Sequence, residues 1–163
     1  AIYRYVHRSR EVWQGDLLQS FTGTTDDNGA RYTVNATRRD DQLAVDREEI
    51  VPIVQAALMD QGLPRHNKSS EMMPGSILPT SHWKRQQVNQ SVLLNTQLGV
   101  QSKVQVVDLG RETVQTSSRS LETTRYRYSG AIRLDQWYDD RDRWVKARFI
   151  ARDGSTVEYT LQE

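Results

Sequence analysis

The feature that most constrains the fold is an alternation of apolar and polar side chains with a period of two, interrupted at short intervals by turn signals. Residues 31–38 place Tyr32, Val34 and Ala36 on one face, as expected for a β-strand, whose successive side chains point to opposite faces. Just before them, Asn28-Gly29 is typical of a type I′ hairpin turn, which needs positive φ at both central residues. The pattern predicts an antiparallel meander over roughly the first fifty residues.

The C-terminal end repeats this pattern. Residues 131–138, 143–151 and 156–161 each alternate, and Asp153-Gly154 lies between the last two. Asp-Gly is a common tight-turn pair, so these segments predict a three-stranded meander. Burial stabilises each large apolar side chain by roughly 1.5–3 kcal/mol before entropy is counted. That gain accounts for five side chains without a ligand: Val145, Phe149, Val157, Tyr159 and Leu161.

The middle of the chain breaks the alternation. Apolar residues from Ile50 to Leu58 have helical spacing, after the acidic pair Glu48-Glu49 and before Gly62, which predicts a short helix. A second helix is expected from about His82 to Asn95, capped by Thr80 or Ser81, with Trp83, Val88 and Val92 forming its apolar stripe. The polar residues between them predict a flexible insertion loop over 62–78.

These elements together predict a mainly β (α+β) fold. We expect a curved antiparallel meander sheet, or half-open barrel, with one or two short helices packed on it. A chain of 163 residues is long enough for one domain with its own core, so residues 1–163 are taken as a single domain. The chain begins within an alternating pattern and without Met, from which we expect further strands upstream.

Composition excludes several classes of function. Lys and Arg number 22 against 21 Asp and Glu, so there is no electrostatic case for binding nucleic acid. The absence of cysteine removes disulfides, thiol catalysis and zinc–thiolate sites. No stretch approaches the roughly 18 apolar residues of a membrane-spanning helix.

Motifs for catalysis or metal binding are also missing. The histidines at 7, 66 and 82 have no metal-ligand spacing, and the acidic run at 139–142 lacks the spacing of a calcium loop. No G-x-S-x-G elbow or phosphate-binding glycine loop is present. We therefore predict no metal and no cofactor. A Ser–His–Asp set assembled in space remains a possible alternative, because such sets need no fixed spacing.

One segment combines several chemical groups in a short space. In "PTSHW", Ser81, His82 and Trp83 bring a hydroxyl, an imidazole and an indole to the expected start of the second helix. Ligands favour concave sites lined by aromatic residues with few polar groups. The facing wall of such a cavity is predicted to come from Tyr126, Tyr128, Trp137 and Tyr138. The alternative interpretation is a capped helix anchored by Trp83, with the other aromatic residues filling the core.

Several ordered motifs resemble one known family. They are "DDNGARYTV", "PTSHW", "LLNTQLG", "TTRYRYSG" and "LDQWYDDRDRWVKARFIARDGSTVEYTL". This combination is similar to a family of bacterial envelope proteins called domain of unknown function 6134. The resemblance implies a periplasmic or secreted location, a secretion signal and additional N-terminal strands. It also implies a curved sheet like the half-barrels of periplasmic lipoprotein carriers, with a helix across the concave face. It supplies no catalytic residues.

The chain departs from the family pattern at two places. Asp142 stands where the family commonly has a glycine, and Asp tolerates positive φ better than most residues. The segment from about Glu48 to Ser76 is longer than usual.

Three hypotheses about function follow. The first is a non-enzymatic envelope protein that binds an apolar or lipid-like molecule in a concave sheet. The second is an interaction module of an envelope assembly, which docks through the face of the strand Trp144–Ile150, because Trp and Arg are common in binding hot spots. The third is a hydrolase that uses His82.

Overall fold

Almost all regular structure in this chain is β-strand, as the alternation predicts. The computed structural model describes residues 2–58, 63–81, 83–151 and 154–162. Two compact units are distinguished: unit 1 consists of Ala1–Ile77 and Leu94–Gln101, and unit 2 of Leu78–Leu93 and Ser102–Glu163. The prediction of a single domain stays a prediction, and each unit is described by itself.

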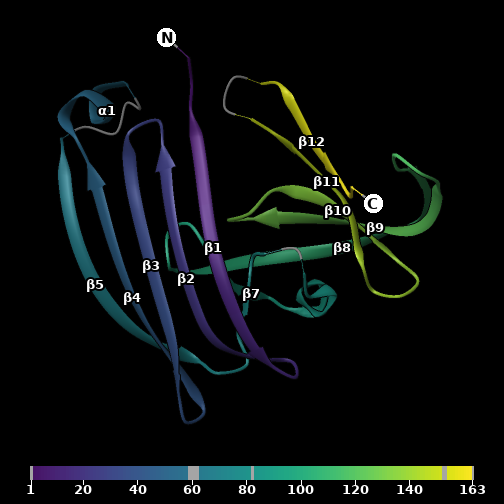
Figure 1. The fold of residues 1–163 in the computed structure, drawn as a ribbon, viewed down its shortest axis with the longest axis horizontal. Coiled ribbons are helices and arrows are strands. Elements are labelled where there is room, and N and C mark those ends of the chain that lie inside the picture. Colours follow the sequence, from purple (N-terminus) through teal and green to yellow (C-terminus); the bar gives the residue numbers. More distant parts are fainter. Residues whose placement is uncertain (1, 59–62, 82, 152–153, 163) are drawn as a thin grey trace. The chain divides into compact units, whose positions relative to one another are not determined.

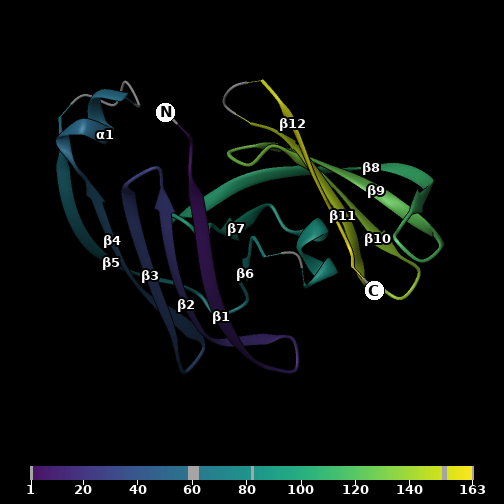
Figure 2. The same cartoon turned by 45° about the horizontal axis from the view of Figure 1, so that its top comes forward.

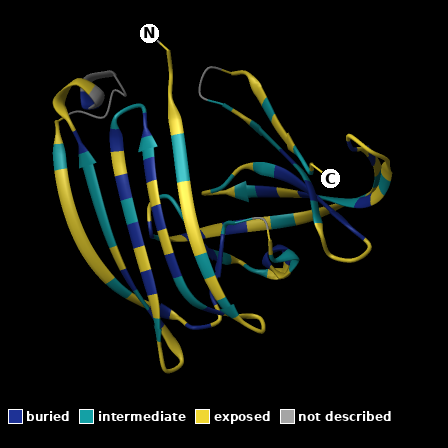
Figure 3. Ribbon diagram, viewed as in Figure 1, coloured by how far each residue is buried: buried dark blue, intermediate teal, exposed yellow. Residues whose placement is uncertain are grey.

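Sheet A, in unit 1, is a five-stranded antiparallel meander. Its strands are neighbours in chain order (Figure 1): β1 (Tyr5–Gln14), β2 (Leu17–Asp27), β3 (Ala30–Arg39), β4 (Gln42–Val51) and β5 (Arg65–Pro74). The predicted hairpin is confirmed, because Asn28 (φ 53°) and Gly29 (φ 97°) both have positive φ. Along β3, buried and exposed residues alternate (Figure 3).

The helix α1 (Ile53–Leu58) is shorter than expected. Its Ala56 packs with Ala30, Tyr32 and Val51 of sheet A. The prediction that Glu48 and Glu49 begin the helix is wrong, because both lie in β4. They have cross-strand partners there: Glu48 pairs with Lys68 at 3.2 Å, and Glu49 forms an ion pair with Arg65.

The predicted flexible loop over 62–78 is wrong for most of its length. Residues Arg65–Pro74 form β5, which pairs with β4 over ten residues in continuous register. The segment carries few apolar residues because it is an edge strand with mostly exposed side chains. Polarity therefore indicated exposure correctly, but it did not distinguish a loop from an edge strand.

The segment 94–101 also belongs to unit 1 and lies against β3 and β4. Arg47 donates from Nη1 to the carbonyl oxygen of Gly99 at 2.8 Å. Gly99 has a φ of 70°, and a Cβ there would lie 3.0 Å from the Cβ of Arg47 and 3.1 Å from a methyl of Val34. Only glycine combines this backbone conformation with so close an approach.

Sheet B, in unit 2, has seven strands in the order β12-β11-β10-β9-β8-β7-β6 and curls into a half-barrel. Strands β8 to β12 of this sheet can be followed individually in Figure 2. The strands are β6 (Leu78–Pro79), β7 (Val92–Leu94), β8 (Gln101–Gln115), β9 (Ser120–Gly130), β10 (Leu134–Asp139), β11 (Trp144–Ile150) and β12 (Thr156–Thr160). The C-terminal meander is thus confirmed. The register of β8 against β9 shifts between Asp108 and Gly110, which marks a bulge within β8.

The predicted helix from His82 to Asn95 is wrong. The described residues form a short 3₁₀ helix, η1 (Arg85–Asn89), followed by strand β7. Two physical reasons favour this outcome. The backbone N–H of Val104 donates to the carbonyl oxygen of Ser91 at 2.9 Å, which aligns the chain with β8. The strand also buries Leu93 and Leu94 completely.

Candidate functional site

The structure brings three of the predicted tyrosines to one face of sheet B. Tyr126 and Tyr128 alternate along β9, and Tyr138 on β10 meets Tyr126 edge-on with ring centres 6.2 Å apart. Gln136, directly opposite Tyr126 in the register, has its side chain on the same side. We call this the inner face, because residues of η1 bind to it.

Trp137 is not part of this cluster. It lies between Gln136 and Tyr138 in β10 and therefore points to the opposite, outer face. Its ring is covered there by the side chains of Arg125, Lys146 and Arg148. The prediction that Trp137 shares a cavity wall with the tyrosines is thus wrong, since neighbouring residues of a strand do not share a face.

Gln87 of η1 is the main polar contact with the inner face. Its Oε1 accepts hydrogen bonds from the hydroxyl of Tyr128 and from Nε2 of Gln136, each at 3.1 Å. Its own Nε2 donates to the backbone oxygen of Ser81 at 2.5 Å. Gln87 is 1% exposed. Each of these buried amide and hydroxyl groups therefore has a partner, as buried polar groups require.

Arg85 makes a second attachment. Its Nη2 donates to the hydroxyl of Tyr126 at 2.7 Å, and its Nε lies 3.4 Å from Oδ1 of Asp142. The hydrogen bond with Tyr126 and the charge of Asp142 raise the pKa of Arg85 above its ordinary value. Asp142 lies in the turn between β10 and β11 and has a φ of 61°, as its place at a common glycine position predicts.

Tyr128 and Tyr138, the two most deeply buried tyrosines of the inner face, are neutral near pH 7. Burial is the largest cause that raises the pKa of Tyr128 and of Tyr138 above the ordinary value. Neutral hydroxyls act as hydrogen-bond donors and acceptors rather than as bases or nucleophiles. The chemical groups that this face presents are therefore aromatic rings, neutral hydroxyls and amides.

The remaining predicted residues are dispersed around this face. Trp83 is 69% exposed and is not an anchor. Ser81 contributes its backbone oxygen to Gln87. His82 lies outside the described residues, so its proposed roles in ligand binding and hydrolysis stay predictions.

Side chains fill the inner face as it stands. Tyr126, Tyr128 and Tyr138 are 6%, 2% and 1% exposed. Arg85 and Gln87 of η1 thus lie where part of a ligand was expected. Arg85, Gln87 and Gln136 are not predicted by the sequence, because a glutamine or an arginine in a polar stretch gives no sign that it will contact a buried face.

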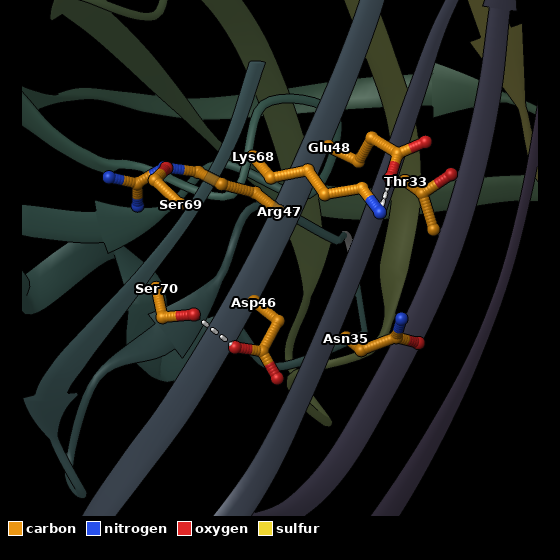
Figure 4. A pocket seen from close by; sticks show the side chains of 8 residues that line it. All are labelled: Thr33, Asn35, Asp46, Arg47, Glu48, Lys68, Ser69 and Ser70. Atoms are coloured by element: carbon orange, nitrogen blue, oxygen red, sulfur yellow. Dashed lines mark hydrogen bonds and ion pairs between the residues drawn. The ribbon is translucent and has the colours of Figure 1, made fainter. Parts of the chain in front are cut away.

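A separate depression of about 420 Å³ lies on sheet A. Its lining residues come from β3, β4 and β5 (Figure 4): Thr33, Asn35, Asp46, Arg47, Glu48, Lys68, Ser69 and Ser70. The polar groups at its centre satisfy one another, since Ser70 donates to Asp46 at 2.5 Å and Lys68 pairs with Glu48. The depression has no aromatic lining, so it differs from the site that the sequence predicts.

Two further findings concern metals and membranes. Within the ranges that the structure describes, no three His, Asp or Glu side chains gather in a way that could hold a metal ion. No helix in those ranges has the length and apolar character needed to cross a membrane.

Comparison with known proteins supports the resemblance noted from the motifs. Curated proteins and solved structures gave no match, so the expected likeness to lipoprotein carriers stays a prediction. One family model matches residues 1–162, nearly the whole length of the chain. The chain therefore belongs to the family described as Domain of unknown function (DUF6134).

Proposed function

We propose that this protein is a non-enzymatic binding protein of the bacterial envelope. In this proposal, an apolar or lipid-like molecule binds to the inner face of sheet B in place of residues 83–91. The observation that carries the proposal is how that segment is attached to the sheet. Gln87 accepts hydrogen bonds from Tyr128 and Gln136, and Arg85 donates one to Tyr126.

A segment held in this way can be displaced at a moderate cost. A typical net hydrogen bond contributes only about 0.5–1.5 kcal/mol. Of the side chains of η1, only Gln87 and Val88 are buried. Displacement would expose a curled face with three tyrosine rings, a kind of surface that suits apolar ligands with a few polar atoms.

The competition between segment and ligand predicts a specific response to mutation. If the segment blocks the face, apparent affinity is reduced by the fraction of molecules in which the face is open. Gln87→Ala removes the hydrogen bonds to Tyr128 and Gln136 and raises that fraction. Gln86→Ala is the matched control, because Gln86 is the exposed neighbour on the same 3₁₀ helix.

The test is a titration of the purified chain with oleate, followed by calorimetry, together with native mass spectrometry of the protein as isolated. We expect Gln87→Ala to bind oleate more tightly than the unmodified protein, and Gln86→Ala to match the unmodified protein. The proposal fails if no variant binds oleate and no lipid co-purifies. It fails equally if the two substitutions affect oleate binding alike.

The location is proposed on the family resemblance. Fractionation of a bacterium that carries a member of this family tests it. Recovery of the native protein in the periplasmic or secreted fraction is expected, whereas recovery in the cytosol overturns this part of the proposal.

A further inference from the structure

The outer face of sheet B carries an ordered arrangement of charges. The strand registers place Arg127, Asp135, Arg148 and Glu158 side by side across four strands. The adjacent row contains Arg125, Trp137 and Lys146. Directly opposed residues of antiparallel strands project from the same face, so these side chains form one continuous surface.

Trp137 lies beneath three cations in this surface. Its ring centre is 4.7 Å from Nζ of Lys146, 4.9 Å from Cζ of Arg125 and 5.4 Å from Cζ of Arg148. Trp137 is 0% exposed, because Val114, Leu121 and Val145 pack against it and the long side chains lie over it. Cation–π attraction and contact with the aliphatic stems hold the cations in place. Their rotamer freedom is thus restricted before any partner binds.

The carboxylates of this surface neutralise only part of its charge. Asp135 accepts hydrogen bonds from Arg125 and Arg127, and Glu158 accepts one from Arg148 and lies 3.6 Å from Lys146. Arg125 also forms an ion pair with Glu112 at 3.3 Å. Four cations therefore face three carboxylates, which leaves an excess of one positive charge. The Arg148–Glu158 bond engages only Nε of Arg148. Within the described part of the chain, both of its Nη groups therefore remain for other acceptors.

Apolar side chains flank the charges. Val107, which lies opposite Arg127 in the register, is 48% exposed, and Ile150, two residues after Arg148, is 65% exposed. Arginine is among the residues enriched in binding hot spots, and the exposed aliphatic side chains add apolar surface beside the arginines.

We propose that this outer face is a docking surface for an acidic, extended segment of a partner protein. Charge complementarity selects that partner. The individual carboxylates of such a segment can bind on either side of Asp135, at Nη1 of Arg127 and at the Nη groups of Arg148, which their bonds to Asp135 and Glu158 leave available. A continuous anionic surface would instead meet those two carboxylates as well. A lipid bilayer or nucleic acid also generally requires a larger basic excess. This surface is opposite the inner face, so the inference is independent of the proposed ligand.

The experiment is calorimetric titration of the full chain with a short oligo-glutamate peptide at low ionic strength. Arg127→Gln together with Arg148→Gln removes two positive charges from the surface while Trp137 stays in place. Arg8→Gln together with Arg10→Gln is the control, because it removes the same charge from exposed positions on β1. We expect the first pair to weaken binding about tenfold or more and the control pair to change it less than about twofold. We also expect added salt to weaken binding to the unmodified protein.

Three outcomes would overturn the inference. They are the absence of peptide binding, equal loss in both double variants, and binding of phosphatidylglycerol vesicles without binding of the peptide. Circular dichroism of each variant shows whether the sheet is intact. If the Arg127/Arg148 variant does not fold, Arg127→Gln alone serves, because that side chain is 55% exposed.

Discussion

The two faces of sheet B bury similar aromatic residues by different means. Gln136 and Tyr138 on the inner face are satisfied by neutral hydrogen bonds and ring contacts, some of them to residues of η1 about fifty positions away in the chain. Trp137, between them, is covered on the outer face by charged side chains from the adjacent strands. The inner face thus depends on a distant segment, whereas the outer face depends on strand register alone.

This difference has consequences for stability. On the outer face, the charged side chains pack over the large ring of Trp137. On the inner face, each polar group relies on a specific partner that one substitution can remove. Four substitutions or conditions separate these effects, beginning with the largest.

Trp137→Ala should give the greatest loss of stability. Removal of a fully buried tryptophan costs about 3–5 kcal/mol of unfolding free energy, and the cations above it lose their support. Trp83→Ala is the control, because Trp83 is 69% exposed and should change stability by less than about 0.5 kcal/mol. Urea unfolding followed by circular dichroism measures both. Equal effects would show that Trp137 is not the centre of the outer face.

Gln87→Ala should lower stability by about 1–3 kcal/mol, because it leaves the buried groups of Tyr128 and Gln136 without their shared acceptor. Gln86→Ala, at the exposed neighbouring position, should have almost no effect. Urea unfolding followed by circular dichroism measures the free energy of unfolding of both variants. If Gln87→Ala left the free energy of unfolding unchanged, η1 would not be attached through this side chain. The contrast drawn between the two faces would then be wrong.

The two faces should also respond to opposite extremes of pH. Burial alone would raise the pKa of Asp135, but hydrogen bonds from Arg127 and Arg125 outweigh it, and the net pKa is lowered. An unfolded Asp has a pKa of about 3.9. The stability that Asp135 contributes is therefore complete above that value and is lost as pH falls through the lower, folded pKa.

The buried tyrosines give stability the opposite dependence on pH. Burial raises the pKa of Tyr128 and Tyr138, whereas an unfolded Tyr titrates near about 10. Their contribution is present below about pH 10 and is lost as pH rises through the folded values. Urea midpoints measured across pH should show Asp135→Asn reducing the acid sensitivity and Tyr128→Phe the alkaline sensitivity. If Asp135→Asn reduced the alkaline sensitivity and Tyr128→Phe the acid sensitivity, the assignment of these groups to the two pH ranges would be wrong.

Asp142→Gly should produce the smallest change. Glycine accepts the φ of 61° without strain, but the substitution removes the exposed ion pair with Arg85, which contributes about 0–1 kcal/mol. We expect a net change within about 0.5 kcal/mol. Asp142→Ala should cost about 1 kcal/mol more, because alanine tolerates positive φ poorly. A larger loss with glycine would show that Asp142, as well as Gln87, fixes η1 to the inner face.

Strands and hairpins could be predicted where local chemistry decides them. Alternation identified the first four strands and the C-terminal meander, and positive φ at Asn28 and Asp142 was expected from residue type. The C-terminal stretch forms the strands that its alternation indicated, but the expected burial of its apolar side chains is wrong in part: Val145 is buried, whereas Tyr159 is 52% exposed. The same alternation places Trp137 and Tyr138 on opposite faces of their strand. The prediction of a shared cavity wall grouped aromatic residues by proximity in sequence and was therefore wrong for Trp137.

The candidate site could be predicted only in part. Tyr126, Tyr128 and Tyr138 do share a face, but nothing in the sequence near residue 87 showed that Gln87 would cover it. A lone glutamine is buried only if distant donors surround it, and those donors come from β9 and β10. The helical spacing at 82–95 was also misleading, because β7 gains hydrogen bonds in sheet B that a helix at the same place would forgo.

The sequence by itself determined the mainly β class, the places of the hairpin turns and the membership of the family, because these depend on side chains and backbone angles a few residues apart. Only the tertiary structure decided that residues 65–74 are an edge strand, that residues 83–91 cover the tyrosines, and that cations gather over Trp137. Each of these depends on partners from other strands or segments, and the local pattern of one segment does not identify those partners.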